Sequence, residues 1–288
     1  MATFKATLKL RSAALAALML FAANSLAWID TGHILVAAIA EKGLQPIVLA
    51  KVRSLLKVGG TDTTRTLWTA SCWADDAKTK ENGVWHYINV HFRDDGKPTD
   101  NRALDENVVW AINRFSKVLA DGSRSQIDRA DALRFLIHFV GDIHQPMHTV
   151  ARDSAEFPRG DRGGNDFHIV SPAGINPVPN NLHFLWDMAG GLYGSTSRPL
   201  DHNSVANVEQ LRDSIMKEFP KSSLTSVGLQ TPSIWKSESY DLARKFAYAM
   251  QPNGKPSTEY LTNCKRVCKR QIALAGYRLA DLLNNLLK

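Results

Sequence analysis

The chain has 288 residues, enough for one large domain or two small ones. Its hydrophobic content of 44% and charged content of 22% are ordinary for a soluble globular protein, and its formal net charge is +7. The sequence has no internal repeat, no low-complexity tract and no second long apolar run after the one near its N-terminus, which excludes a repeat protein and a multi-span membrane protein.

The N-terminus has the features of a secretory signal peptide. Lys5, Lys9 and Arg11 precede the apolar run AALAALMLFAA, which small residues follow and which is too short to span a bilayer as a helix. We expect residues 1–27 to be removed on export and residues 28–288 to form the mature domain, periplasmic or secreted, without stable membrane association. Removal of the three cations lowers the formal charge from +7 to +4. That charge agrees with a polyanionic substrate without showing one.

Helical periodicity dominates the rest of the chain. The predicted helices are, in chain order, Thr31–Lys42, Pro46–Lys57, Glu106–Ala120, Ser125–His144, Val205–Phe219, Pro232–Met250 and Glu259–Leu287. The only convincing extended segment is Trp85–Phe92. The segment Phe157–Asn181 is a loop rich in Gly, Pro and Asn. It is interpreted as functional because histidines and aspartates that could carry chemistry flank it on both sides. The pattern predicts one mostly α-helical domain with little β structure.

Three cysteines, Cys72, Cys264 and Cys268, allow at most one intramolecular disulfide in an exported protein. Cys264 and Cys268 are four residues apart on a predicted helix, where an unstrained bridge is not assured. Because no second pair of cysteines accompanies this CxxxC pattern, it is only weak evidence for a zinc site. Two half-buried thiols on one helix face are the favoured interpretation.

The stretch HFVGDIHQPMHT, residues 138–149, places several histidines and an aspartate on an otherwise apolar run. His138 and Asp142 are four residues apart, so they project from one face of a helix. Pro146 then breaks the helix, which would let His148 turn toward the same point.

The stretch NNLHFLWDM carries a second pair at the same spacing, His183 and Asp187, on another predicted helix. One such pair alone usually indicates a surface ion pair or a cap. Two pairs, one of them followed by a further histidine, favour convergence on a metal site. Imidazole and carboxylate ligands suit Zn²⁺, whose catalytic sites keep a position open for water. Composition and spacing take the prediction no further.

Six short motifs resemble those of the zinc-dependent, single-strand-specific nucleases of the S-one/P-one type from fungi and plants. In chain order they are WIDTGH, ASCWADD, WHYINV, HFVGDIHQPMH, GGN and NLHFLWD, and the first begins at the predicted cleavage point. The resemblance spans nearly the whole mature chain. It implies a helical fold of the kind shared by phospholipase C and P-one-type nucleases. It also implies an endonuclease acting on phosphodiester bonds of single-stranded DNA and RNA.

The resemblance further implies a cofactor of three zinc ions. Their ligands would be Asp75, His86, His138 and Asp142; His148, His183 and Asp187; and His33, Asp142 as a bridging carboxylate and Trp28. Trp28 would bind through its free α-amino nitrogen and its backbone carbonyl, so signal-peptide cleavage before Trp28 would be part of making the site.

The chemistry implied is hydrolysis by a hydroxide that bridges two metal ions, with 5′-phosphate products and 3′-nucleotidase activity as a side reaction. By the resemblance, Asp75 belongs to the catalytic set, Lys78 stabilises charge on the scissile phosphate and Asn165 of GGN helps to position it. Tyr87 would stack on a base that has left its neighbours, which explains a preference for single strands. Asn89 stands where some relatives carry an Asp that touches the base, so base preference stays open.

Four histidines remain outside the implied ligand set: His91, His144, His168 and His202. The resemblance implies that the position of His144 varies, so we expect its hydrogen bonds to lie outside the zinc cluster. His91 and His168 are near the site in sequence and could touch substrate, whereas His202 is expected at the surface.

The nearest alternative function is a zinc-dependent phospholipase C, which resembles this family in fold and in its N-terminal Trp ligand. Its last ligand is typically Glu, where this chain has Asp187. An exported binding protein with an inactive zinc site is disfavoured because every implied ligand is present. A zinc store is disfavoured because the histidines interleave with carboxylates at catalytic spacing. DNA or RNA preference, optimum pH, oligomeric state and biological role stay open.

Overall fold

The structure is a computed structural model that describes residues 28–99 and 103–288. The predicted signal peptide, residues 1–27, lies outside the described residues. The long helices are α1 (Asp30–Gly43), α2 (Pro46–Lys57), α5 (Val108–Ala120), α6 (Gln126–Asp142), α8 (His202–Glu218), α9 (Pro232–Leu242) and α10 (Thr258–Leu286). The short elements are α3 (Leu67–Ala70), α4 (Trp73–Asp76), η1 (Gly83–His86), β1 (Val90–Phe92), η2 (Pro146–Thr149), β2 (Val150–Arg152), α7 (Leu182–Asp187), η3 (Ala189–Gly191), η4 (Lys221–Ser223) and η5 (Ala243–Ala247). The prediction of a mostly helical fold is confirmed.

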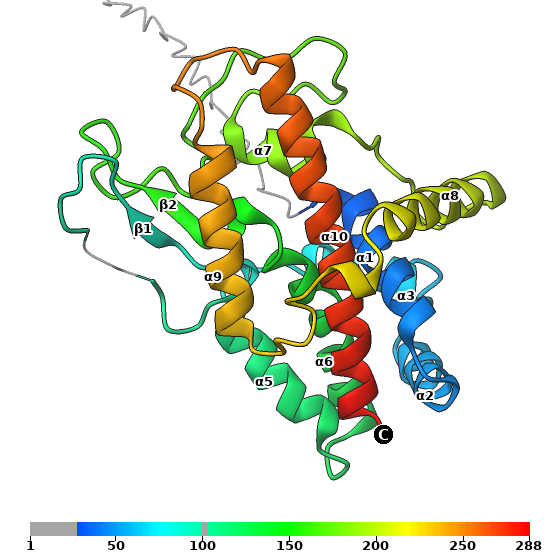
Figure 1. Ribbon diagram of the computed structural model, residues 1–288. Coiled ribbons are helices and arrows are strands. Elements are labelled where there is room, and N and C mark those ends of the chain that lie inside the picture. Colours follow the sequence, from blue (N-terminus) through cyan, green and yellow to red (C-terminus); the bar gives the residue numbers. More distant parts are fainter. Residues whose placement is uncertain (1–27, 100–102) are drawn as a thin grey trace, which may run out of the picture.

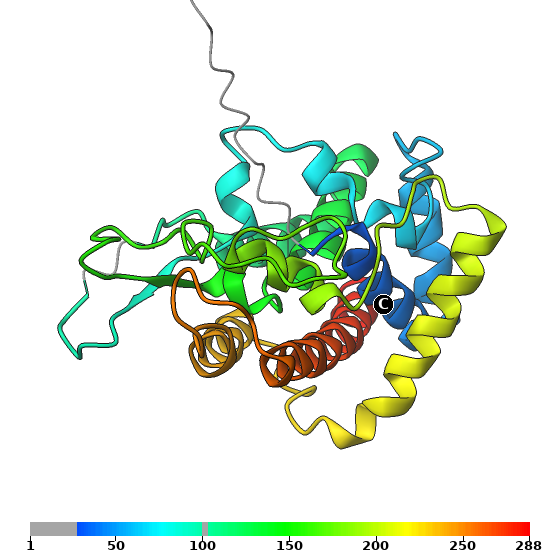
Figure 2. The same ribbon diagram turned by 90° about the horizontal axis from the view of Figure 1, so that it is seen from above.

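Helices α1 and α10 form the centre of the molecule (Figure 1). Every residue of α1 from 31 to 40 is buried, as expected of a helix that other helices surround on all sides. The contact with α10 is close because Gly276 carries no side chain: a Cβ there would lie 2.5 Å from Ile39 Cγ2. Helix α8 runs along the outside of this core (Figure 2).

Helix α6 is the second buried helix and packs against α5 and α2. Its last two turns are buried on all sides, and they end in Asp142. The only sheet in the described part of the chain has two parallel strands, β1 and β2, with Val90 opposite Val150. The sheet places the segment after η1 beside the segment after η2, and thereby sets His86 close to His148.

Two predicted elements differ from the observed ones. Trp85–Phe92 was predicted as extended, but Gly83–His86 is a 3-10 helix and only Val90–Phe92 is a strand. An extended chain points neighbouring side chains to opposite faces. Here Trp85 packs on Phe135 and His86 on Phe139, which are one turn apart on α6, so both point the same way.

The predicted helix Pro232–Met250 also ends early. Regular helix stops at Leu242 and the chain continues as one wide turn of π-helix, Ala243–Ala247. Contacts made by the end of this segment replace the regular helical bonds. The Tyr248 hydroxyl donates to Asp161, and the carbonyl of Ala247 accepts from the Tyr260 hydroxyl at 2.7 Å.

The remaining helix ends lie within three residues of their predicted positions, and side-chain caps account for the observed starts of α5 and α6. Asn107 accepts from the amides of Val109 and Trp110, so α5 begins at Val108 instead of Glu106. Ser125 caps α6 in the same way.

The three cysteines are buried and free, more deeply than the predicted half-buried thiols. Cys264 Sγ and Cys268 Sγ are 3.9 Å apart, too far for a disulfide. Within residues 28–99 and 103–288, no helix has both the length and the apolar character to cross a bilayer.

Candidate metal centre

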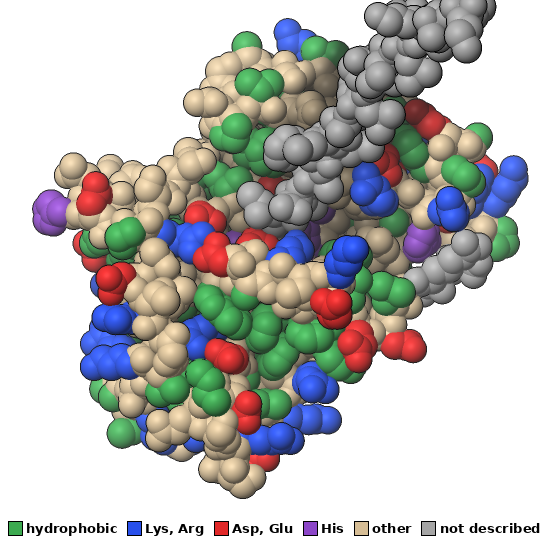
Figure 3. Space-filling model, turned by 180° about the vertical axis from the view of Figure 1, so that it is seen from behind, with side chains coloured by type: hydrophobic (Ala, Val, Ile, Leu, Met, Phe, Trp, Pro, Cys, Tyr) green, Lys and Arg blue, Asp and Glu red, His purple; other side chains and the backbone are tan. Residues whose placement is uncertain are grey.

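The side chains predicted as metal ligands meet around the C-terminal end of α6. This helix presents His138 and Asp142 from one face. The other elements around it contribute His33 from α1, Asp75 from α4, His86 from η1, His148 from η2, and His183 with Asp187 from α7. The side chains of His138 and Asp142 are 0% exposed, and the side chains of the others are at most 8% exposed. On the face shown in Figure 3, histidine side chains are visible at the bottom of a hollow.

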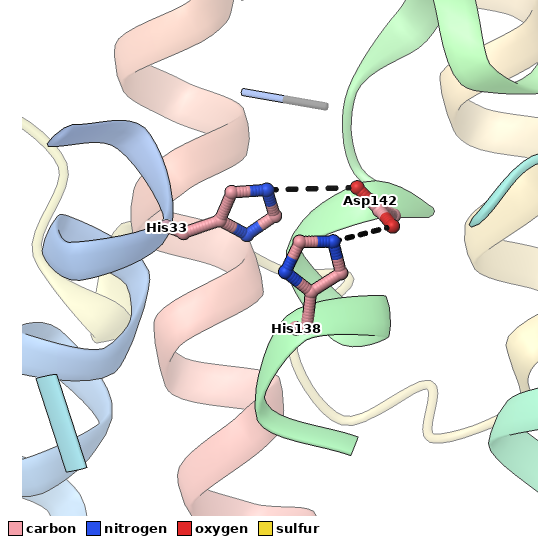
Figure 4. Close-up of side chains that lie close together, drawn as sticks. All are labelled: His33, His138 and Asp142. Carbon is pink, nitrogen blue, oxygen red and sulfur yellow. Dashed lines mark ion pairs between the residues drawn. The ribbon is translucent and has the colours of Figure 1, made fainter. Parts of the chain in front are cut away.

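Asp142 is the centre of the cluster. Its Oδ2 lies 3.1 Å from both His138 Nε2 and His86 Nδ1. Its Oδ1 lies 3.4 Å from His148 Nδ1 and 3.6 Å from His33 Nε2. Figure 4 shows the rings of His33 and His138 facing this carboxylate from α1 and α6. The two rings are stacked, and their centroids are 3.9 Å apart. One carboxylate is therefore within reach of four imidazoles, as a bridging ligand requires.

The candidate ligand atoms fall into three groups with the spacing of metal sites. Within each group, one nitrogen or oxygen of every residue lies within 4.8 Å of the others. The groups are His33, His138 and Asp142; Asp75, His86 and His138; and His148, His183 and Asp187. The third group is one of the three predicted ligand sets. The first two adjoin through His138 and contain the side-chain ligands of the other two sets.

Backbone carbonyls orient three of the imidazoles. The Nδ1 atoms of His138, His148 and His183 each donate to a carbonyl, those of Ser71, His86 and Gly163, at 2.6, 2.9 and 2.7 Å. Such a bond fixes the tautomer and leaves Nε2 as the electron-pair donor toward the cluster. The arrangement is typical of histidines that bind metal.

Several buried polar atoms of the cluster have no hydrogen-bond partner among the residues that the structure describes. They are His33 Nδ1 and Nε2, His86 Nε2, His148 Nε2, Asp75 Oδ1, Asp142 Oδ1 and Asp187 Oδ2. Each unpaired buried atom costs about 1–3 kcal/mol. So many in one place indicates that they bind another group. Their mix of imidazole nitrogen and carboxylate oxygen fits zinc ions.

The protonation states of the histidines in the cluster also suit the binding of zinc ions. Burial lowers the pKa of His86 to about 4 and, with the charge of His148, lowers the pKa of His183 to about 3. Both are therefore neutral near pH 7, the form that binds metal. Burial opposes charge on His138 too, but Asp142 and Asp75 outweigh it and raise its pKa to about 9. The second proton of His138, on Nε2, therefore lies near the carboxylates of Asp75 and Asp142, where a metal cation would replace it.

The predicted N-terminal ligand lies beside the cluster. Trp28 is 1% exposed, and its indole Nε1 donates to the carbonyl of Gly141 at 3.1 Å. The amide of Ile29 donates to the carbonyl of Asp187 at 3.2 Å. Gly141 also lets His33 approach, since a Cβ there would lie 2.9 Å from His33 Nδ1. Metal binding through the amino nitrogen of Trp28 stays a prediction.

The predicted substrate residues border the cluster from the side of η1. Lys78 Nζ lies 3.6 Å from Asp75 Oδ1, and its side chain is 25% exposed. Tyr87 follows the ligand-bearing η1 directly. With Asn89 it lines a cavity of about 260 Å³ next to the cluster. Burial raises the pKa of Tyr87, so its hydroxyl stays neutral near pH 7.

Asn165 bonds to its own loop. Its amide Nδ2 donates to the carbonyl of Arg162 at 2.8 Å, so its contact with a phosphate stays a prediction. The two glycines before it are explained by close packing. The carbonyl of Gly163 orients His183, and a Cβ on Gly164 would lie 2.6 Å from Met147 Cε. Both have positive φ, which favours glycine.

One contributing residue was missed from the sequence. Gln145 Nε2 donates to Asp187 Oδ1 at 2.5 Å, and its Oε1 accepts from the amide of Met147. It thus fixes the carboxylate of Asp187, a candidate ligand that lies 42 residues later in the sequence. The available signal was its place in HQPMH, between a histidine and the proline that turns the chain.

The other histidines bond outside the cluster, as expected for His144. Its Nδ1 donates to the carbonyl of Val140 at 2.7 Å, and its Nε2 accepts from Arg278 at 2.9 Å. His91 Nδ1 lies 2.6 Å from Asp153 Oδ1. The two others, His168 and His202, are exposed.

Comparison with known proteins places the chain in a family. The family profile described as S1/P1 Nuclease matches residues 28–288. Endonuclease 5 of Arabidopsis thaliana is 29% identical over 291 residues, which cover 91% of each chain. Nuclease P1 of Penicillium citrinum is 26% identical over 282 residues, covering 90% of this chain and 97% of the relative. Nuclease S1 of Aspergillus oryzae is 24% identical and covers 93% and 95%. The resemblance seen in the motifs is confirmed: the chain belongs to the S1/P1 nuclease family, a family of phosphodiester-hydrolysing enzymes.

Proposed function

We propose that residues 28–288 form an exported, zinc-dependent endonuclease that cleaves single-stranded DNA and RNA to 5′-phosphate products, with 3′-nucleotidase activity at the same site. The observation that carries the proposal is the cluster of buried imidazole and carboxylate atoms that lack hydrogen-bond partners within the described residues. Family membership supports the nuclease chemistry. Removal of residues 1–27 as a signal peptide is part of the proposal.

Three zinc ions would be held by the side chains of the cluster and by Trp28. When bound, they would supply an activated water near neutral pH and neutralise charge on the phosphate. Asp142 would bridge two of the ions, since its two oxygens face different imidazoles. Gln145 would keep the Asp187 carboxylate in its binding orientation.

The side chains around the cluster would hold the substrate. Lys78 reaches from the rim toward Asp75 and would pair with the scissile phosphate. Tyr87 and Asn89 would hold the adjoining base in their cavity, which a base can enter only after it has left a stack. Asn165 would add a contact to the phosphate when its amide turns away from Arg162.

The test is a comparison of the mature protein with two aspartate variants. Protein that starts at Trp28 is assayed against single-stranded DNA, single-stranded RNA and phosphatidylcholine, and its zinc content is measured. We expect Asp142→Asn to lower the zinc content and to reduce nuclease activity by at least roughly 100-fold, since even changes to groups that only support ligands cost 10- to 100-fold. Asp153→Asn is the control, because this carboxylate is also buried, at 8% exposure, but pairs with His91.

Two outcomes would contradict the proposal. One is fewer than two zinc ions in the active wild-type protein. The other is turnover of phosphatidylcholine without turnover of nucleic acid, which would indicate the phospholipase C alternative.

The role of the N-terminus has its own test. A variant with one extra residue before Trp28 converts the amino nitrogen into an amide, which cannot bind a metal in the same way. We expect lower zinc content and a sharp loss of activity, and unchanged activity would remove Trp28 from the ligand set.

A further inference from the structure

Helix α5 starts at the proposed base-binding cavity and leads away from it. The amide of Val108 donates to the carbonyl of Tyr87 at 3.2 Å. Asn107, the cap of α5, lines the cavity together with Tyr87 and Asn89. From Asn107 to Lys117 the helix advances about 15 Å at its usual rise of 1.5 Å per residue. A strand that leaves the cavity in this direction would follow the outer face of α5.

That outer face is cationic. Trp110, Arg114 and Lys117 occupy positions i, i+4 and i+7 and therefore share one face. Together with Arg124, which follows the helix, they line a surface cavity of about 400 Å³ that no acidic side chain borders. Arg114 and Lys117 are exposed, and neither forms an ion pair within the described part of the chain. Only Arg124 has an acidic neighbour, with its Nε 3.4 Å from Asp121 Oδ2.

Aromatic rings connect this face with the metal centre. The Arg114 guanidinium lies over the Trp110 ring, 5.1 Å from its centroid, and the Trp110 ring is 5.5 Å from that of Trp85. Trp85 directly precedes His86 of the cluster. One carboxylate lies along this route, that of Glu106, which accepts from Trp85 Nε1 at 3.3 Å.

We propose that Trp110, Arg114, Lys117 and Arg124, here called the α5 patch, form a second, non-catalytic binding site for single-stranded nucleic acid. The patch holds the part of the strand that flanks the cleaved bond. The cations neutralise phosphates, and the half-buried Trp110 packs against a sugar or base. These contacts do not depend on the base sequence of the strand. This inference rests on the proposed function, because the strand bound by the patch is the one that the metal centre cleaves.

The patch has a kinetic consequence. A dinucleotide fills the metal centre and its base cavity without reaching the patch, whereas a longer strand occupies both. Longer strands should therefore have a lower KM, and their KM should rise more steeply with salt, because phosphate contacts release counterions.

The test is the triple variant Arg114→Gln, Lys117→Gln, Arg124→Gln in the zinc-loaded mature protein. Cleavage kinetics are measured on a dinucleotide and on an oligo(dT) strand of about 20 nucleotides, over a series of salt concentrations. Binding is measured separately by fluorescence anisotropy with a phosphorothioate oligo(dT), which is slow to hydrolyse. The exposed positions of the substituted residues mean that folding should be unaffected, and a thermal melt checks this.

We expect the triple variant to bind the long strand up to about tenfold more weakly and to show a correspondingly higher KM for it. The slope of log K against log salt should fall by up to about two, since each single-strand phosphate contact contributes about 0.7. Cleavage of the dinucleotide should stay within about twofold of wild type.

The matched control removes the same charge elsewhere: Arg53→Gln, Lys57→Gln, Arg65→Gln, which border a different cavity between α2 and α3. The control should bind like wild type.

The outcomes separate the two proposals. Equal binding of the long strand by the α5 variant and wild type, or an equal loss in the control, would overturn the α5 patch. Weaker binding by the α5 variant, in a protein whose wild type cleaves neither substrate, would support the patch and overturn the proposed function.

Discussion

Replacement of Arg278 by Met should destabilise the fold, because this guanidinium joins four segments in the interior. Arg278 is 0% exposed. Its Nη1 donates to His144 Nε2 at 2.9 Å and to Glu238 Oε2 at 2.7 Å, and its Nη2 donates to the carbonyl of Ser226 at 2.8 Å. The bonds tie α10 to the turn after α6, to α9 and to the loop before α9.

The size of the effect follows from what the substitution leaves behind. Met fills most of the space of the arginine stem, so no large cavity forms. The buried His144 Nε2 and the partly buried carbonyl of Ser226 lose their donor, at about 1–3 kcal/mol each, with the carbonyl at the low end. Glu238 is 26% exposed and regains water, so its contribution is small. The expected loss of unfolding free energy is roughly 2–4 kcal/mol, the sum of these two penalties. In a domain of this size that lowers Tm by about 10 °C.

The assay is thermal and urea unfolding of the zinc-loaded mature protein near pH 7, with Arg270→Met as the control. Arg270 is also on α10, but it is half-buried, and its side chain has one hydrogen bond within the described residues, to Gln271 Oε1 at 3.2 Å. Its replacement should cost less than about 1 kcal/mol. A loss of unfolding free energy in Arg278→Met no larger than that in Arg270→Met would contradict the prediction.

Three further perturbations test other parts of the structure. Gly276→Ala should cost about 1–3 kcal/mol in chemical unfolding, because its Cβ would lie 2.5 Å from Ile39; no loss would mean that α1 and α10 can separate freely. Arg198 binds Asp76 through two bonds of 2.6 and 2.9 Å, and a double-mutant cycle with Arg198→Ala and Asp76→Asn should give a coupling of about 1 kcal/mol that weakens in salt; zero coupling at low salt would contradict it. Burial and then the charge of Arg278 hold the pKa of His144 well below 6.5, so the unfolded chain takes up a proton below pH 6.5 that the folded chain does not, and stability falls as pH falls. The free energy of unfolding, measured by urea titration, should therefore drop between about pH 7 and pH 5 by up to about 1.4 kcal/mol per pH unit more in wild type than in His144→Gln, and equal pH dependence would refute this origin.

Helices were predicted well because their signal is local. The apolar spacing of α10 and the proline that starts α2 are properties of neighbouring residues, and the observed bounds agree to within one residue. Trp85–Phe92 was misjudged because the direction of Trp85 and His86 is set by α6, which lies far away in the sequence. The end of α9 was misjudged for the same reason, since the bonds of Tyr248 and Ala247 are tertiary.

In the candidate metal centre, too, the local features could be predicted from the sequence and the long-range ones could not. The spacing of His138 and Asp142 predicts that both side chains leave one helix face, and His183 and Asp187 repeat the pattern. That these pairs meet, and that His33, Asp75 and His86 join them, required either the resemblance to a family or the folded structure.

The sequence by itself determined the candidate ligand types, the helical scaffold and, through its motifs, the family. Only the tertiary structure decided how the ligands are held: Asp142 lies between imidazoles from four elements, carbonyls of Ser71 and Gly163 orient two of them, and Gln145 fixes Asp187. The physical reason is that a helix specifies directions over one or two turns, whereas the distance between ligand atoms on different elements depends on the packing of the whole core.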